Sequence, residues 1–281
     1  MGRQLRIVHH TGYRYPDGIA ASRNEVRMTP RTNREQLVLA TSLEISPTAW
    51  TYGYRDYWGT QVTAFEISAP HDRLQVVATS TVEVGDRPSA GLGISWEEVL
   101  APDLADLQVE LLQVAGHIEP PAELLSLAQE IRRDAGSPAQ AVHQLVTAIR
   151  ERVDYVPGST EVHTRASEVW EARAGVCQDL VQLGLGALRS IGVPARYVSG
   201  YVMPAQDPVP GQPQTGESHA WLQYWDGSWV GLDPTNDTAP GDFHVEIGTG
   251  RDYFDIPPLK GVYSGSSDSD MFVEVEITVL A

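Results

Sequence analysis

Cys177 is the one cysteine of this 281-residue chain, and it lies in the segment RAGVCQDLVQLGLGALRSIGVPARYVSGYV at residues 173–202. The residues before it are polar and mixed, whereas those after it are apolar. A buried structural cysteine usually lies inside an apolar run, not at its front edge. The apolar positions that follow have helical spacing, and Gly192 and Pro194 end the pattern. Cys177 is therefore predicted in the first turn of a helix.

This position suits a nucleophile. The amino end of a helix carries about half a positive charge, which favours the thiolate, the reactive form of cysteine. The alternative is a small packing residue, and for a lone cysteine taken by itself that alternative would be the better interpretation.

A nucleophilic thiol needs a base, and His219 is the best placed of the eight histidines. It opens the segment HAWLQYWDGSWVGLDPTND, in which two strand-like stretches flank the turn at Asp226 and Gly227. Counted outward from that turn, His219 and Asp233 fall at the same end of a hairpin, on neighbouring strands. A carboxylate beside an imidazole fixes its tautomer and stabilises its protonated form. We therefore predict a catalytic set of Cys177, His219 and Asp233.

The elements that must position these residues change character along the chain. Residues 1 to about 110 form short stretches rich in Val, Ile, Thr, Tyr and Phe between turn-forming pieces, which predicts a sandwich-like sheet domain. Helical periodicity follows at 121–136 and 137–153, and the second helix is expected to have Ser137 as its N-cap. Strands return at 195–203, 219–227, 228–235 and 271–280. The prediction is an α+β chain.

We predict two domains, a β-rich N-terminal domain over residues 1–100 and a catalytic domain over residues 101–281. The boundary is expected in the Pro- and Gly-containing segment 86–101. The β domain should pack on the catalytic one, and the last strand could return to it. A single continuous sheet through both regions would refute this expectation.

Composition excludes several function classes. The net charge of −17 argues against nucleic acid and against anionic membrane surfaces, since both need clustered Lys and Arg. We attribute the acidity to solubility rather than to a site for basic substrates. No apolar stretch approaches the ~18 residues of a membrane span, and the N-terminus lacks the apolar region of a signal peptide. With one cysteine, the chain is expected to be cytoplasmic.

Metal and cofactor motifs are absent from the sequence, so neither a metal nor a cofactor is predicted. There is no HExxH and no paired-cysteine spacing. The stretch GTGRDY at 248–253 lacks the third glycine and the preceding parallel-strand pattern of a phosphate-binding loop. Arg196, in PARYVSGY, is expected to be a structural ion pair rather than a substrate clamp.

Several separated segments together resemble a known family. GVCQD, RSIGVPARYVSGY, SHAWLQYW and SWVGLDPTN resemble the core of the transglutaminase-like superfamily, in the order that the family has them. VHHTGYRY, MTPRT, VPGSTEVHTRASEVW and GRDYFDIPPLKGVYSG extend the similarity to the bacterial branch with a β-rich N-terminal domain.

The resemblance implies a papain-like core in which the cysteine-bearing helix packs on an antiparallel sheet. Residue by residue, it implies Cys177 as nucleophile, His219 as base and Asp233 as the group that orients His219. There is one departure, because Gln182 stands where this branch has a histidine.

Together these observations predict a thiol enzyme whose partner is a peptide or protein amide. Cys177 would attack the carbonyl, His219 would protonate the departing amine, and a thioester would form. The backbone N–H of Cys177 and one further donor, which the sequence does not identify, would bind the oxyanion. Resolution by water gives a cysteine peptidase or amidase, and resolution by an amine gives a protein-glutamine transamidase.

We favour hydrolysis, because water is always present and no motif for an amine site is visible. A non-catalytic peptide-binding module on the same fold is the alternative from another class. Its signature would be a broken triad, and this triad is intact.

Overall fold

The structure is a computed structural model that describes residues 2–85, 87, 90–203 and 208–280. Of the predicted boundary segment 86–101, residues 86, 88 and 89 lie outside the described residues. Among the described residues, none of the helices combines the length and the apolar character that a bilayer crossing requires.

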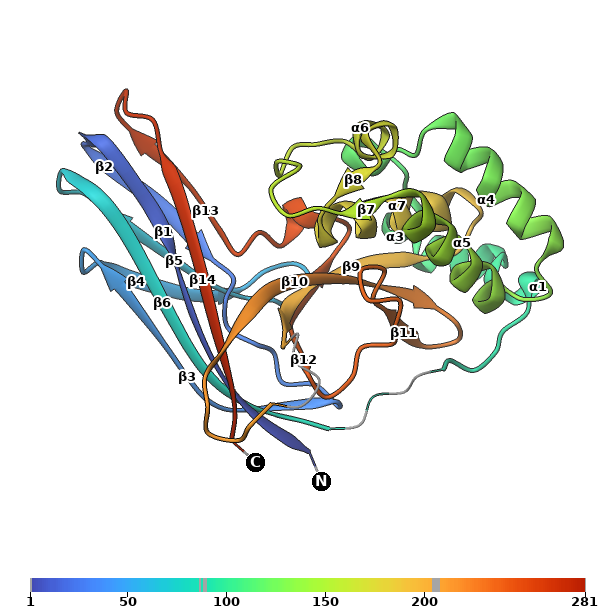
Figure 1. Cartoon of the computed structure of the whole chain (residues 1–281), viewed down its shortest axis with the longest axis horizontal. Helices are drawn as coiled ribbons and strands as arrows, with labels where there is room; N and C mark the ends of the chain where they lie inside the picture. The colour runs from blue at the N-terminus through green and yellow to red at the C-terminus, as the bar shows by residue number, and fades with distance from the viewer. Residues whose placement is uncertain (1, 86, 88–89, 204–207, 281) are drawn as a thin grey trace.

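The central element is an eight-stranded sheet that runs through the whole molecule (Figure 1). Its strands follow the order β12-β9-β10-β14-β1-β6-β3, and β11 pairs with β10. Their bounds are β1 (Arg3–Ile19), β3 (Gln36–Ser46), β6 (His71–Val84), β9 (Ala195–Val202), β10 (Gln214–Trp225), β11 (Trp229–Leu232), β12 (His244–Gly250) and β14 (Asp270–Val279).

A second, four-stranded sheet covers part of the first. Its order is β13-β2-β5-β4, with bounds Leu259–Ser264, Ala21–Val26, Gln61–Ile67 and Trp50–Arg55. Apolar side chains from both sheets form a common core, for example Leu74 and Val76 of β6 with Phe65 and Ile67 of β5. Alternation along these strands places one face of each sheet in the core, which gives the predicted sandwich-like region.

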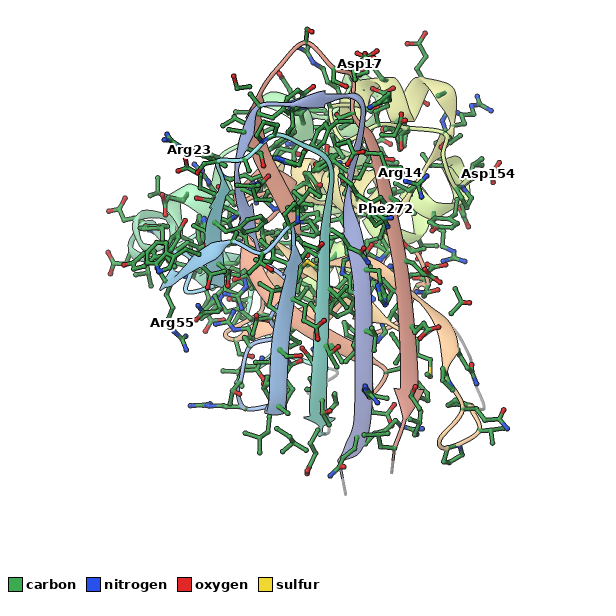
Figure 2. All side chains as sticks on the ribbon, turned by 90° about the vertical axis from the view of Figure 1, so that its left-hand side faces the viewer. Arg14, Asp17, Arg23, Arg55, Asp154 and Phe272 are labelled. Atoms are coloured by element: carbon green, nitrogen blue, oxygen red, sulfur yellow. The ribbon has the colours of Figure 1, made fainter. Side chains whose placement is uncertain are left out.

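The last strand joins the N-terminal strands to the core. β14 pairs with β1 from Leu5↔Val279 to Arg14↔Asp270, and it also pairs with β10 around Gly216. Figure 2 shows β3, β6, β1 and β14 side by side, with Arg14 near the ring of Phe272, where its guanidinium lies 5.6 Å from the ring centre.

One sheet therefore runs through both regions, so the expectation of a separately packed N-terminal sheet is wrong. The change of periodicity near residue 100 marks the start of the helices, not an end of the sheet. β13, which also follows the core in sequence, likewise belongs to the strand-rich part.

Helices pack against β9, β10 and β11 on the other side of the molecule (Figure 1). α7 is central, because every residue from Gln178 to Arg189 is buried. The Ser137 hydroxyl caps α5 by accepting a hydrogen bond from the backbone N–H of Gln140, as the sequence predicts. The larger helices are α4 (Ala122–Asp134), α5 (Pro138–Arg152), α6 (Ala166–Ala172) and α7 (Cys177–Ser190).

Shorter elements connect these parts. Four helical turns precede α4: α1 (Trp96–Val99), α2 (Pro102–Leu107), α3 (Val109–Leu112) and η1 (Gly116–Ile118). Two-residue strands, β7 (Asp154–Tyr155) and β8 (Ala174–Gly175), pair in parallel just before α7, and η2 (Tyr253–Asp255) follows β12.

Candidate active site

Cys177 is the first residue of α7, as the sequence predicts, and it is half-buried. The turn before it is held by Asp179, whose Oδ2 accepts hydrogen bonds from the backbone N–H of Val176 at 2.8 Å and from the Thr160 hydroxyl at 2.5 Å. A Cβ on Gly175 would lie 2.9 Å from the Cβ of Asp179, so the approach requires glycine there. These contacts hold the backbone turn that leads into Cys177.

His219 and Asp233 lie at the same end of the β10–β11 hairpin. The strands pair from Trp225↔Trp229 at the turn to Leu222↔Leu232, and Gly227 supplies a positive φ of 76° in the turn. The His219 Nε2 lies 2.7 Å from Asp233 Oδ2. The predicted pairing of these two side chains is thereby confirmed as geometry.

Asp233 is a fully buried carboxylate that accepts many hydrogen bonds. Besides His219, the Asn236 side chain donates to Oδ2 at 2.7 Å, and the backbone N–H groups of Thr235 and Asn236 donate to Oδ1. Burial alone would raise its pKa, but these donors, with His219 and His244, hold the pKa of Asp233 well below its usual range. Asp233 is therefore a fixed negative charge behind His219.

His244 is a member of this cluster that the sequence did not reveal. Its Nε2 lies 3.2 Å from Asp233 Oδ2, and its Nδ1 accepts a hydrogen bond from the backbone N–H of Gly241. Burial, with the charges of His219 and Arg87, lowers the pKa of His244. A neutral His244 with Nδ1 as acceptor carries its proton on Nε2, so it donates to Asp233.

The Nδ1 of His219 is buried and has no hydrogen-bond partner among the described residues, so it is the ring nitrogen left for the thiol or the substrate. Burial would lower the pKa of His219, but the influence of Asp233 and of Cys177 raises it to about 10. The arrangement favours an imidazolium beside the Asp233 carboxylate.

The same cluster contains the donor types of a metal site. His219, Asp233 and His244 each offer one ligand atom, all within 4.8 Å of one another. However, both imidazoles already contact the Asp233 oxygen at hydrogen-bond distances, and the donating Nε2 of His244 carries a proton. A metal ligand must present a free nitrogen lone pair, so these three residues fit a hydrogen-bond network better than a metal site.

A surface cleft lies near the start of α7. Tyr155 of β7 pairs with Gly175 of β8, two residues before Cys177, and burial, with the charges of Glu217 and Cys177, raises the pKa of Tyr155 to about 12. A cavity of about 350 Å³ is lined by Tyr155, Glu217, Glu274 and their neighbours on β10 and β14, and Cys177 is not among its lining residues. The cleft therefore carries two carboxylates.

Comparisons with known proteins match the two regions of the chain separately. Residues 5–83 match the bacterial transglutaminase-like N-terminal region, and residues 125–234 match the transglutaminase-like superfamily. A protein of Mycobacterium leprae without assigned function is 41% identical, with 99% of each chain covered. The chain belongs to the transglutaminase-like superfamily.

This transglutaminase-like chain is also similar to a named enzyme and to a solved crystal structure. A protein-glutamine gamma-glutamyltransferase of Pseudomonas aeruginosa is 28% identical over 52% of this chain and 23% of its own. The crystal structure of a candidate cysteine protease from Cytophaga hutchinsonii covers 100% of this chain and 92% of its own, with a TM-score of 0.80 at 23% identity. That likeness confirms the α+β transglutaminase-like fold.

Gln182 and Arg196 of this transglutaminase-like chain were both singled out in the sequence. Gln182, the departure from the family pattern, is buried, and neither polar atom of its side chain has a partner among the described residues. Arg196 was expected in an ion pair. Instead, its Nε donates to the neutral Gln223 side chain at 2.8 Å, and its guanidinium lies 4.2 Å from the centre of the Trp229 ring.

Proposed function

We propose that this chain is a thiol enzyme that cleaves peptide or isopeptide amides, as a cysteine peptidase or amidase. The observation that carries the proposal is His219, whose Nε2 lies 2.7 Å from Asp233 Oδ2 and whose pKa is raised by both Asp233 and Cys177. An imidazole held in this way can accept the thiol proton and later deliver it to a leaving amine.

The reaction proceeds in two steps. The Cys177 thiolate attacks the amide carbonyl, the C–N bond breaks, and His219 gives its proton to the departing nitrogen, which leaves a thioester. Water then attacks the thioester, His219 takes a proton from that water, and the acid product leaves as the thiol is restored. Asp233 stabilises the imidazolium that is present before the amine departs and again after water has given its proton to His219.

The oxyanion of each tetrahedral intermediate needs hydrogen-bond donors. The backbone N–H of Cys177 is at the first position of α7, where no intrahelical acceptor exists for it. Tyr155 is the proposed second donor, since β7 pairs with β8 just before Cys177 and the raised pKa of about 12 keeps the proton on its hydroxyl.

Transamidation is the competing outcome for the same thioester. It is supported by the similarity to a protein-glutamine gamma-glutamyltransferase, and by Glu217 and Glu274 in the cleft, which favour a substrate or acceptor with positive charge. We favour hydrolysis, because water reaches an open cleft without a dedicated site.

The test is a peptide library treated with the protein, with and without an added primary amine, and read by mass spectrometry. Hydrolysis predicts cleaved peptides in both arms, whereas transamidation predicts amine-modified glutamine in the second arm. The Cys177→Ala variant is the control and should produce neither. A library that remains intact although Cys177 reacts with iodoacetamide would favour the non-catalytic peptide-binding module.

We further propose that the chain works in the cytoplasm on peptide or protein substrates. The single cysteine supports this location. Fractionation of cells into cytoplasmic, membrane and secreted material, followed by detection with an antibody, tests it directly.

A further inference from the structure

A second polar cavity lies where the N-terminal strands meet the core, and it shares no lining residue with the cleft near the start of α7. Its volume is about 190 Å³, which is room for about six water molecules at liquid density. The charged residues that line it are Arg31, Arg34, Arg87, Arg196, Glu35 and Glu246.

The cavity has an excess of positive charge. Four arginines face two glutamates, whereas the whole chain carries a net charge of −17. Partly buried cations are expensive unless anions compensate them. The local excess of two positive charges is therefore a feature that calls for a negative partner.

Within the described part of the chain, Arg196 is one arginine of this cavity that lacks an anionic partner. Its guanidinium is held by the Gln223 side chain through Nε and by the face of Trp229, and among the described residues its two Nη atoms have no hydrogen-bond partner. Burial, with the nearby charge of Arg31, lowers the pKa of Arg196 to about 10, although the charges of Glu246 and Glu35 oppose the shift. The side chain is thus fixed in place with its donors free.

Arg31 and Arg87 approach the cavity from the N-terminal part. Arg31 pairs with the buried Glu246 at 3.2 Å, and Arg87 donates to Gln36 and to the backbone carbonyl of His244. The Nε of Arg87 is buried and has no partner among the described residues. Unpartnered buried donors are rare in folded proteins and point to a ligand or an ion.

We propose that this cavity is a binding site for a compact oxyanion with two negative charges, of the phosphate type, held between Arg31, Arg87 and Arg196. A planar guanidinium presents donors that match phosphate oxygens. Two charges on the anion balance the local excess, and the cavity has room for a small tetrahedral ion. The ion bridges the segments beside the N-terminal strands, which carry Arg31 and Arg87, to Arg196 of β9 and so stabilises the junction between them.

Inorganic phosphate is the probe, measured against the full chain by isothermal titration calorimetry and by thermal unfolding, with chloride at equal ionic strength as the reference. Saturable binding and an increase in Tm of about 3 °C or more at saturation are expected. The Arg196→Gln variant should bind at least tenfold more weakly. Arg196→Lys should also bind more weakly, because it keeps the charge but loses the planar guanidinium that can donate two parallel hydrogen bonds.

Two further variants separate the proposal from a general charge effect. Glu246→Gln should bind phosphate several-fold more tightly, because it removes a competing anion from the cavity. Arg133→Gln, which removes an exposed charge in α4, should leave the affinity unchanged. Far-UV circular dichroism checks that each variant is folded.

Glycerol phosphate and malonate in the same titration distinguish the sources of the anion. Binding of glycerol phosphate as well as phosphate identifies a phosphate monoester as the ligand, and binding of phosphate alone identifies the free ion. Absence of saturable phosphate binding up to about 20 mM, tighter binding of malonate than of phosphate, or equal affinities of Arg196→Gln and the unchanged protein would each overturn the proposal. None of these outcomes depends on turnover, so the site is tested independently of the proposed activity.

Discussion

The Nε2 of His244 donates to Asp233 from β12, 3.2 Å away, although Asp233 lies just after β11 and only Asp233 was predicted as part of the site. In the proposed reaction His244 would act through Asp233, as a positioning residue. It holds the carboxylate that holds His219.

Replacing His244 with Ala should lower kcat about tenfold and leave KM nearly unchanged, because the carboxylate loses one of its donors but the substrate cleft is untouched. The loss of a donor should also change the pKa of His219, measured by NMR. His244→Gln, which keeps an N–H donor, should restore most of the activity. If kcat, KM and the pKa of His219 in the His244→Ala variant all matched those of the unchanged protein, His244 would serve packing alone.

Cys177→Ala should abolish turnover, by about three orders of magnitude or more, and leave the fold intact, because the thiol is half-buried at a helix start. Iodoacetamide should label Cys177 in the native protein faster than it labels a model thiol at neutral pH. The rates are compared by mass spectrometry. A thiol that reacts only after denaturation would indicate a structural cysteine.

Asp233→Asn should reduce acyl-enzyme formation strongly without abolishing it, and His219→Ala should be worse, since it removes both base and acid. The double variant should resemble His219→Ala, because Asp233 then has nothing left to orient. Rapid-quench kinetics on all three variants measures this. If Asp233→Asn reduced the rate of acyl-enzyme formation by the same factor in the presence and in the absence of His219, the two residues would not act as a unit.

The pH dependence follows from His219, whose pKa rises from 6.5 to about 10 in the folded chain. The stability that this ion pair adds is fully present below about pH 6.5 and is lost as the pH rises through about 10. Activity should fall over the same alkaline range, because the proton for the leaving amine is lost. In Asp233→Asn this alkaline limb should move to lower pH by at least about one pH unit. If the alkaline fall in activity stayed at the same pH in Asp233→Asn, it would report the titration of another group.

Tyr155→Phe should lower kcat/KM by about tenfold to a hundredfold, because it removes the proposed second oxyanion donor but keeps the ring. Tyr57→Phe, an exposed tyrosine in the strand-rich part, is the matched control and should have no effect. Single-turnover acylation rates for both variants give the answer. If the two variants were indistinguishable, the second donor would have to be sought elsewhere in the cleft.

The sequence predicted the parts of the fold that have strong periodicity or clear end signals. α5 has Ser137 as its cap, α7 starts at Cys177, and the hairpin turn at Gly227 sets the register that joins His219 to Asp233. These features are local, so a single stretch of sequence contains the information.

β12 could not be predicted in this way. β12 contains two glycines and the buried Glu246, so it lacks the apolar alternation of a strand, and His244 was missed with it. For β14 the alternation and a return to the N-terminal region were expected, and its pairing with β1 confirms both, but its exact partner strands depend on contacts far away in sequence. Arg196 was misjudged for the same reason, since its partners Gln223 and Trp229 are defined by the assembled sheet.

The pairing of β14 with β1 also has a consequence in time. The Thr11 hydroxyl donates to the backbone carbonyl of Phe272 across 261 residues of sequence, so this ladder cannot form during synthesis until nearly all of the intervening chain has left the ribosome. Until then one long edge of β1 is unpaired and open to association with other nascent chains. β14 thus completes the sheet and also pairs with β10, the strand that carries His219. His219 should therefore reach its place beside Asp233 only at the end of folding.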